Sequence, residues 1–189
     1  MHNRRVESHI GLIAASNKDI AIYDVNKNKV IHKMQEAEGL KHAHTIKYYT
    51  GSYSRGDPDS LNTFLTGSAD NTILLWDLRV AFKPVREFTG GHQNRSQQIG
   101  FEVSNCYRYL LTGSESRTAC VYDIGTGQPV DKTKNSIHGD AVMDVSFNPA
   151  YNEWSSACID GHARTFRYPA QKLKAKGRNG GGGLAMDAL

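Results

Sequence analysis

Long hydrophobic runs are missing from this 189-residue sequence, and their absence argues against whole classes of protein. No stretch approaches the roughly 18 consecutive apolar residues that a membrane-spanning helix needs. The first residues, Met1 to Arg5, also lack the apolar segment of a secretory signal. We therefore expect no membrane span, and we predict a cytoplasmic location.

Cysteine is scarce as well. Cys106, Cys120 and Cys158 are an odd number at wide spacings, so neither a disulfide framework nor a Cys-x-x-Cys metal site is indicated. We interpret them as small apolar side chains buried in a reducing compartment. The sequence gives no reason to expect a bound metal or other cofactor.

An excess of charge of one sign is also lacking. Lys and Arg number 23 against 19 Asp and Glu, a net charge of +4, which is too small a bias to predict nucleic-acid binding. The excess gathers in residues 169–189, where four basic residues precede four glycines. We expect a flexible basic tail there and a polar lead over residues 1–9.

What the sequence does contain is a repeat. Tyr23, Trp76, Tyr122 and Phe166 occupy equivalent positions in four similar stretches, 53, 46 and 44 residues apart. A period of this length is typical of repeat architectures. We place the copies at about residues 10–35, 36–89, 90–134 and 135–168.

Each copy consists of short runs rich in β-branched and aromatic residues, separated by Gly, Asn, Asp and Pro. This spacing leaves no room for helices and predicts an all-β fold. Four strands in about 45 residues are typical of one β-propeller blade. The clearest predicted strands are 72–77 in the second copy; 98–103, 109–113, 119–123 and 130–133 in the third; and 142–147, 153–157 and 163–168 in the fourth.

Two recurring pairs carry a resemblance to a known family. An aromatic-Asp pair ends a strand at Tyr23-Asp24, Trp76-Asp77 and Tyr122-Asp123, while Gly91-His92 and His138-Gly139 stand at repeat starts. In phase, these features resemble the WD-repeat family of β-propellers over residues 10–168. The resemblance implies a partial WD-repeat propeller of about three and a half four-stranded blades.

The resemblance also implies a hydrogen-bonded chain of one His, one Asp, one Ser or Thr and one Trp within a repeat. A half-buried indole N–H needs an acceptor, and a hydroxyl can both accept and donate. By position, the members are His44 (or its neighbour His42), Thr66, Asp70 and Trp76 in the second copy; His92, Thr112 and Tyr122 in the third; and His138, Ser156 and Asp160 in the fourth. Ser116 and Phe166 replace the Asp and the Trp of the third and fourth copies, so we expect a complete chain in the second copy alone.

In this family, the loops that enter each blade and the turn that carries the Asp line one face. We expect partner contacts first on that face, because rigid scaffolds present loop residues at little entropic cost. The candidate residues are Arg95, Glu115, Arg117, Asp140 and His162.

The strand material falls short of the seven blades with which such a propeller usually closes. We therefore expect strand edges that would be exposed unless further sequence or a partner chain covers them. Three arrangements stay open: a longer propeller protein, self-association, or completion of another chain's ring.

No catalytic constellation stands out. His42 and His44 have no third metal ligand at a readable spacing, and His92 and His138 fill positions that the repeat uses structurally. We therefore predict a non-enzymatic protein-interaction scaffold without a small-molecule substrate. Its partners would be proteins or a missing propeller half. The alternatives are a structural subunit of a large ciliary or cytoskeletal assembly and, third, an anionic-polymer binder acting through the tail.

Overall fold

The computed structural model describes ten stretches of the chain, and both terminal segments predicted above lie outside them. The described residues are 10–14, 19–24, 27–34, 40–41, 43–49, 63–77, 83–132, 137–148, 150–151 and 153–167. In this part of the chain there are fourteen strands and no helix. No helix that could cross a membrane was found in the same residues.

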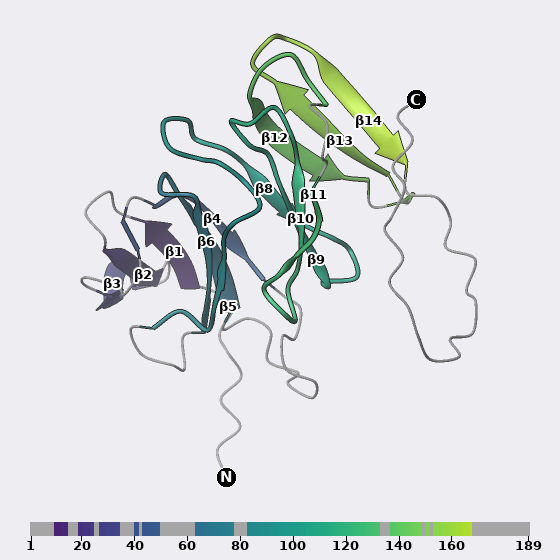
Figure 1. Cartoon of the computed structure of the whole chain (residues 1–189). Coiled ribbons are helices and arrows are strands. Elements are labelled where there is room, and N and C mark those ends of the chain that lie inside the picture. Colours follow the sequence, from purple (N-terminus) through teal and green to yellow (C-terminus); the bar gives the residue numbers. More distant parts are fainter. Residues whose placement is uncertain are drawn as a thin grey trace, which may run out of the picture. The chain divides into compact units, whose positions relative to one another are not determined.

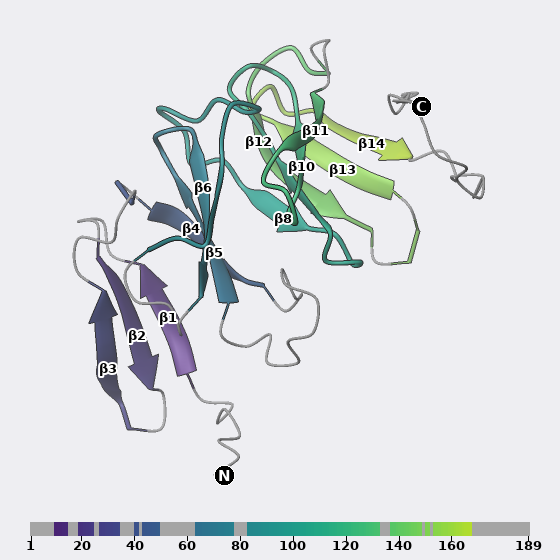
Figure 2. The same ribbon diagram turned by 60° about the horizontal axis from the view of Figure 1, so that its bottom comes forward.

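The strands form four antiparallel sheets, drawn in Figures 1 and 2. The first sheet contains β1 (Ile10–Ala14), β2 (Ile20–Asp24) and β3 (Lys29–Met34). The second contains β4 (Ala43–Tyr48), β5 (Thr63–Ser68), β6 (Thr72–Asp77) and β7 (Arg86–Phe88). The third contains β8 (Phe101–Val103), β9 (Tyr109–Thr112), β10 (Cys120–Asp123) and β11 (Pro129–Lys132), and the fourth β12 (Val142–Phe147), β13 (Glu153–Cys158) and β14 (Ala163–Arg167).

These sheets confirm the predicted all-β fold of blade-like, four-stranded antiparallel units. Each sheet is a meander of sequential strands, which is the connection that short turns between antiparallel strands allow. Two sheets have four strands and two have three within the described residues. One sheet falls in each of the four predicted copies.

The chain divides into two compact units. Unit 1 comprises residues 1–89 and 94–98 and holds the first two sheets, while unit 2 comprises residues 90–93 and 99–189 and holds the other two. The boundary falls inside the connection between β7 and β8 rather than at its end. A short piece of the predicted third copy therefore packs with the second.

The core of unit 1 is built on β5 and β6, whose side chains are buried almost throughout. β6 reads Thr-Ile-Leu-Leu-Trp-Asp, and the run is apolar because both of its faces are covered. The rings of Phe64 and Trp76 are stacked, with centroids 6.1 Å apart. The core cluster consists of Ile20, Leu40, Phe64, Leu74 and Trp76.

The core of unit 2 lies between its two sheets, where β12 contacts β8 and β9. Gly100 and Gly113 permit this approach: a Cβ at Gly100 would collide with the Asp144 carboxylate, and one at Gly113 with the Val142 carbonyl oxygen. The core cluster consists of Leu111, Ala119, Val121, Val142, Val145, Trp154 and Phe166.

Several predicted strand limits agree with the structure, and one is wrong by three residues. The strands at 72–77 and 142–147 match β6 and β12. The strand predicted from 98 begins instead at Phe101. The reason is that the N–H of Gly100 donates to the carbonyl of Met143, 2.7 Å away in the neighbouring sheet of unit 2.

Candidate functional site

The second copy joins two of its predicted network residues. Trp76 lies on β6 and Thr66 opposite on β5, and the indole Nε1 donates to the Thr66 hydroxyl over 2.9 Å. Both side chains are fully buried. The bond therefore supplies the acceptor that a buried indole N–H needs.

His44 and Asp70 lie near this pair but bond elsewhere. In the described part of unit 1, His44 hydrogen-bonds Thr45 and Asn94, each at 2.9 Å, and does not reach Thr66. Asp70 instead accepts from the Thr72 hydroxyl and pairs with Lys41, 3.5 Å away. Burial lowers the pKa of His44, although the backbone of Ser68 and the charge of Asp70 oppose this shift.

Asn94 makes structural contacts that the sequence did not indicate. Its backbone N–H donates to the Asn71 side chain over 2.6 Å, and the Asn71 N–H returns a bond to the Asn94 carbonyl. This exchange fixes residues 94–98 to the β5–β6 turn of unit 1. Asn71 has a φ of 65°, which asparagine tolerates better than most residues. The turn at residues 68–71 agrees with the loop composition of the sequence, but no local signal indicates its bonds to Asn94.

The third copy builds a different arrangement around Tyr122. Its hydroxyl accepts from the N–H groups of Gly91 and His92, at 2.9 and 3.2 Å, and hydrogen-bonds His92 Nδ1 at 2.7 Å. Burial of the phenol raises the pKa of Tyr122 well above its ordinary value. Tyr122 therefore holds the loop before the third blade through the phenol itself.

The remaining predicted positions of the third copy bond locally. The Thr112 hydroxyl donates to the carbonyl oxygens of Gly100 and Gly113. Ser116, in the Asp position, hydrogen-bonds Ser114 at 2.7 Å and Thr118 at 2.8 Å. Hydroxyl groups thus take the place of the carboxylate in this turn.

The fourth copy pairs His138 with Ser156, both buried, through Nε2 and Oγ at 2.7 Å. Phe166, in the indole position, stacks on Trp154 with ring centroids 4.3 Å apart. Trp154 Nε1 has no hydrogen-bond partner among the described atoms, nor does His138 Nδ1. The fourth copy therefore combines strong ring packing with two unsatisfied buried nitrogen atoms.

Asp160 sits in the β13–β14 turn beside this pair. Its carboxylate accepts from the His162 N–H at 2.9 Å and lies 3.3 Å from His162 Nδ1. A hydrogen bond from the Cys158 thiol is the largest cause that lowers the pKa of Asp160 to about 2. Burial lowers the pKa of His138, with a further lowering by Arg164 that Asp160 opposes.

Four of the predicted face residues lie on loops that are tied together in unit 2. The N–H groups of Ile137 and His138 donate to the Arg117 carbonyl, which joins the β9–β10 turn to the loop before β12. A Cβ at Gly139 would lie 3.2 Å from Asp160, so that loop also approaches the β13–β14 turn. The face residues that these loops carry are Glu115, Arg117, Asp140 and His162.

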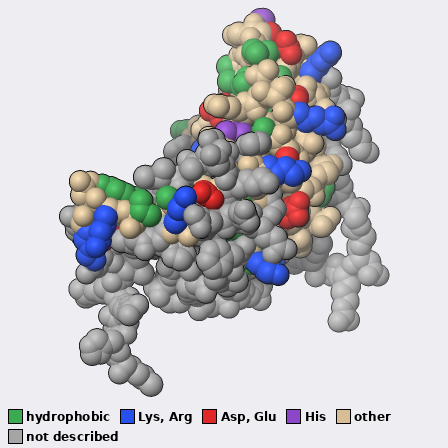
Figure 3. Space-filling model, turned by 90° about the vertical axis from the view of Figure 1, so that its left-hand side faces the viewer, with side chains coloured by type: hydrophobic (Ala, Val, Ile, Leu, Met, Phe, Trp, Pro, Cys, Tyr) green, Lys and Arg blue, Asp and Glu red, His purple; other side chains and the backbone are tan. Residues whose placement is uncertain are grey.

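These face residues are accessible and of mixed charge. Arg117, Asp140 and His162 are exposed, and Glu115 is half-buried. Arg95 is exposed as well, but it belongs to unit 1. The view in Figure 3 likewise shows acidic and basic side chains intermingled rather than gathered by sign. Mixed charge of this kind contributes specificity more than affinity.

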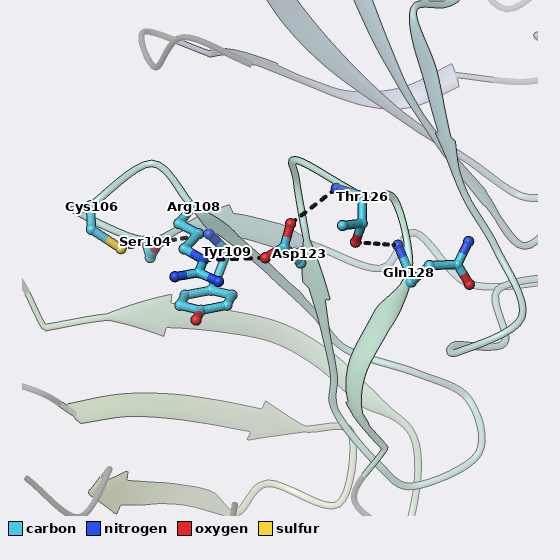
Figure 4. A network of polar contacts seen from close by, with 7 residues as sticks. All are labelled: Ser104, Cys106, Arg108, Tyr109, Asp123, Thr126 and Gln128. Atoms are coloured by element: carbon cyan, nitrogen blue, oxygen red, sulfur yellow. Dashed lines mark hydrogen bonds and ion pairs between the residues drawn. The ribbon is translucent and has the colours of Figure 1, made fainter. Parts of the chain in front are cut away.

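The opposite end of β9 and β10 carries a second polar network (Figure 4). Arg108 donates to Asp123 over 3.2 Å and lies 5.2 Å above the ring of Tyr109. Asp123 also accepts from the Thr126 N–H, and the Thr126 hydroxyl from the Gln128 N–H. These contacts all lie within residues 108–128 of the third sheet, so Arg108 provides a reference for experiments on the other end of the hairpin.

A family model supports the repeat assignment. The model described as WD domain, G-beta repeat matches residues 49–77. This range contains β5 and β6 with the Thr66–Trp76 bond. The match shows that this part of the second copy is similar to a WD40 repeat.

Curated relatives are similar over more than half of the chain. A guanine nucleotide-binding protein subunit beta from Arabidopsis thaliana is 37% identical over 109 residues, which are 56% of this chain and 27% of that protein. Protein SPA1-RELATED 4 from the same plant is 32% identical over 109 residues, 55% of this chain and 13% of the relative. Coatomer subunit beta'-2 is 31% identical over 109 residues, 57% and 11% respectively. The chain thus spans under a third of these relatives, and the similarities support the WD-repeat family.

Proposed function

We propose that this chain is a non-enzymatic WD-repeat scaffold whose loop face in unit 2 binds a protein partner. The loop face is defined as Glu115, Arg117, Asp140 and His162. The similarity to guanine nucleotide-binding protein beta subunits and to a coatomer subunit supports a role in protein assembly. We infer that partners recognise the alternating charges of this face.

The observation that carries the proposal is the bonding between the loops. Arg117 has a φ of 66°, and its carbonyl accepts two N–H groups from the next loop. The Ala141 N–H donates to the Asp140 carboxylate at 2.7 Å, which orders the rest of that loop. Because the backbone is held by these bonds, a partner binds without having to order the loops themselves.

The test compares two identical charge removals at the two ends of β9. Arg117→Gln removes a cation from the loop face, and Arg108→Gln removes one from the network in Figure 4. Proteins retained by the tagged full chain are quantified for the wild type and both variants. We expect partners that Arg117→Gln loses and Arg108→Gln keeps.

Two results would contradict the loop face. An identical partner set for both variants means that Arg117 makes no contact. Equal loss from both means that charge in general, rather than this face, retains the partners. Circular dichroism of both variants confirms that each is folded before the comparison.

A second candidate is a structural subunit whose sheet edges are covered by neighbours, as in a ciliary or cytoskeletal assembly. The observation that favours it is β14, which pairs with β13 alone within the described residues, where the four-stranded sheets have a further strand. Strand addition at such an edge is an established binding mode. Light scattering of the full chain tests it: a defined oligomer supports edge pairing, and a monomer favours the loop face.

We also propose a relation to WD repeat-containing protein 27, because the segments 65–79, 99–127 and 138–149, in that order, resemble its C-terminal repeats. The free state of Cys106, Cys120 and Cys158 supports a reducing, cytoplasmic location. Binding of an anionic polymer through residues 169–189 lies outside the described part of the chain, and loss of salt-sensitive binding on deleting the tail would test it.

A further inference from the structure

The fourth copy differs from the others at two positions of one turn. Cys158 stands where the second and third copies have Ser68 and Ser114. His162 stands where they have Thr72 and Thr118, the hydroxyl groups that bond to the Asp-position residue. Both substitutions replace hydroxyl groups with better metal ligands.

The fold brings these donors to a third. One ring nitrogen of His138, the Cys158 sulfur and a carboxylate oxygen of Asp160 lie within 4.8 Å of one another. His138 comes from the loop before β12, whereas the other two come from the end of β13 and its turn. Because His138 is far from Cys158 and Asp160 in the sequence, a search for metal ligands at short spacing does not find this cluster.

One ring nitrogen of His138 is available to bind a metal ion. Its side chain is 5% exposed, and Ser156 engages Nε2 at 2.7 Å. Nδ1 has no hydrogen-bond partner in the described structure. A buried nitrogen without a partner is costly, and a metal ion beside it would remove that cost.

We propose that His138, Cys158 and Asp160 form a binding site for Zn²⁺, with His162 as the fourth ligand. The Ser156 hydroxyl on Nε2 is the outer contact that holds the imidazole so that Nδ1 faces the ion, a common arrangement at metal sites. On binding, the Cys158 thiol releases its proton to solvent and the thiolate coordinates the ion.

The donor set selects the metal. One sulfur, two imidazole nitrogens and one carboxylate oxygen suit Zn²⁺, whereas Mg²⁺ and Ca²⁺ prefer oxygen ligands alone. Metal–ligand lengths of about 2.0 to 2.3 Å in a tetrahedron place the donors about 3.5 Å apart. The three clustered donors lie within 4.8 Å of one another, so they draw closer to reach this spacing when the ion binds.

His162 can complete the tetrahedron because its side chain is 77% exposed and already lies 3.3 Å from the Asp160 carboxylate. Rotation of an exposed side chain meets little resistance. Asp160 is exposed too, which leaves the ion a path from solvent.

Cobalt(II) is the probe, because a thiolate ligand gives Co²⁺ an intense charge-transfer absorption and tetrahedral geometry gives it strong visible bands. The full chain, with reduced thiols, is titrated with Co²⁺ and then with Zn²⁺. We expect one equivalent of Co²⁺ to develop both absorptions and Zn²⁺ to abolish them. A chain that develops neither absorption overturns the proposal.

Two variants restore residues of the other copies, which keeps the risk to folding low. Cys158→Ser should abolish the charge-transfer absorption. His162→Thr should keep it but weaken binding at least about tenfold, the scale on which single contacts at metal sites act. The matched control is Cys106→Ser, which removes an exposed thiol elsewhere in unit 2.

The control separates the outcomes. An absorption that survives Cys106→Ser and disappears in Cys158→Ser supports the site. The reverse pattern overturns the site. If the wild type and His162→Thr bind Co²⁺ equally tightly, His162 is not the fourth ligand. None of these results depends on the loop face as a partner site.

Discussion

His92 and Tyr122 meet edge to face, with ring centroids 5.8 Å apart and an interplanar angle of 88°. The phenol oxygen lies 2.7 Å from His92 Nδ1 and also accepts the backbone N–H groups of His92 and Gly91. One hydroxyl thus holds both the side chain and the backbone of the loop that leads into the third blade.

Replacing Tyr122 with Phe should destabilise unit 2 by about 2 kcal/mol. The variant leaves the half-buried N–H of Gly91 and the buried N–H of His92 without their acceptor, and an unsatisfied buried group costs about 1 to 3 kcal/mol. Urea unfolding followed by tryptophan fluorescence in a Trp76→Phe background measures the change, since the remaining indole, Trp154, lies in unit 2. Tyr151→Phe, at a side chain 68% exposed, is the control and should leave stability unchanged. Equal midpoints for the two variants would show that the loop bonds contribute nothing.

Trp76→Phe should cost more than Trp154→Phe, although both indoles are buried to the same extent. The first change removes the bond to Thr66 and leaves that hydroxyl buried, whereas Nε1 of Trp154 has no partner to lose. We expect a difference of about 1 kcal/mol, the usual net contribution of one hydrogen bond. Thermal and urea unfolding by circular dichroism compare the two variants. A larger cost at Trp154 would contradict the bonding described here.

Gly113→Ala should destabilise unit 2 strongly. The new methyl group would collide with the backbone carbonyl of Val142, which cannot turn aside as a side chain can. Overpacking of this kind costs about 1 to 3 kcal/mol. Gly90→Ala is the spatial control, because nothing lies within 4 Å of a Cβ there, although its φ of 74° adds some strain. If Gly113→Ala unfolds at the wild-type midpoint, the two sheets of unit 2 do not pack as closely as described.

Stability should fall as the pH decreases below about 6.5. The folded-state pKa of His138 is lowered chiefly by burial, with Arg164 and His162 adding to the shift and Asp160 opposing it. The unfolded chain therefore binds a proton first, and stability that is complete above pH 6.5 is lost as the pH falls toward the folded-state pKa. His44 acts in the same direction in unit 1. Urea midpoints between pH 7.5 and 5.5 measure the effect, and a midpoint that rises over this interval would contradict it.

The sequence was a good guide to the strands because local signals set their limits. β6 and β12 start and end as predicted, since turn residues stand on both sides of an apolar or alternating run. The limit at Phe101 was missed because the Gly100 N–H bonds across to Met143, and no local pattern contains that partner.

The sequence was a poorer guide to the polar contacts. It named Thr66 with Trp76 and His138 with Ser156, and the structure brings each of these pairs together. It did not foresee that His44 would bond to Asn94, which lies 50 residues away and outside its own copy. Nor did it group Cys158 with His138. Alignment of the repeats assigns a role to each position separately and does not show which side chains from different positions lie close together.

The aromatic position shows how four similar copies stay distinct while the chain folds. Trp76 needs the Thr66 hydroxyl, Tyr122 needs the loop at Gly91 and His92, and Phe166 needs the flat face of Trp154. Tandem repeats can misassemble by exchanging equivalent strands. Here an exchanged strand would bring a phenol to a position without the N–H donors of Gly91 and His92, or would take from Phe166 the ring of Trp154. The different aromatic residues of the copies thus favour pairing of each strand with the strands of its own sheet.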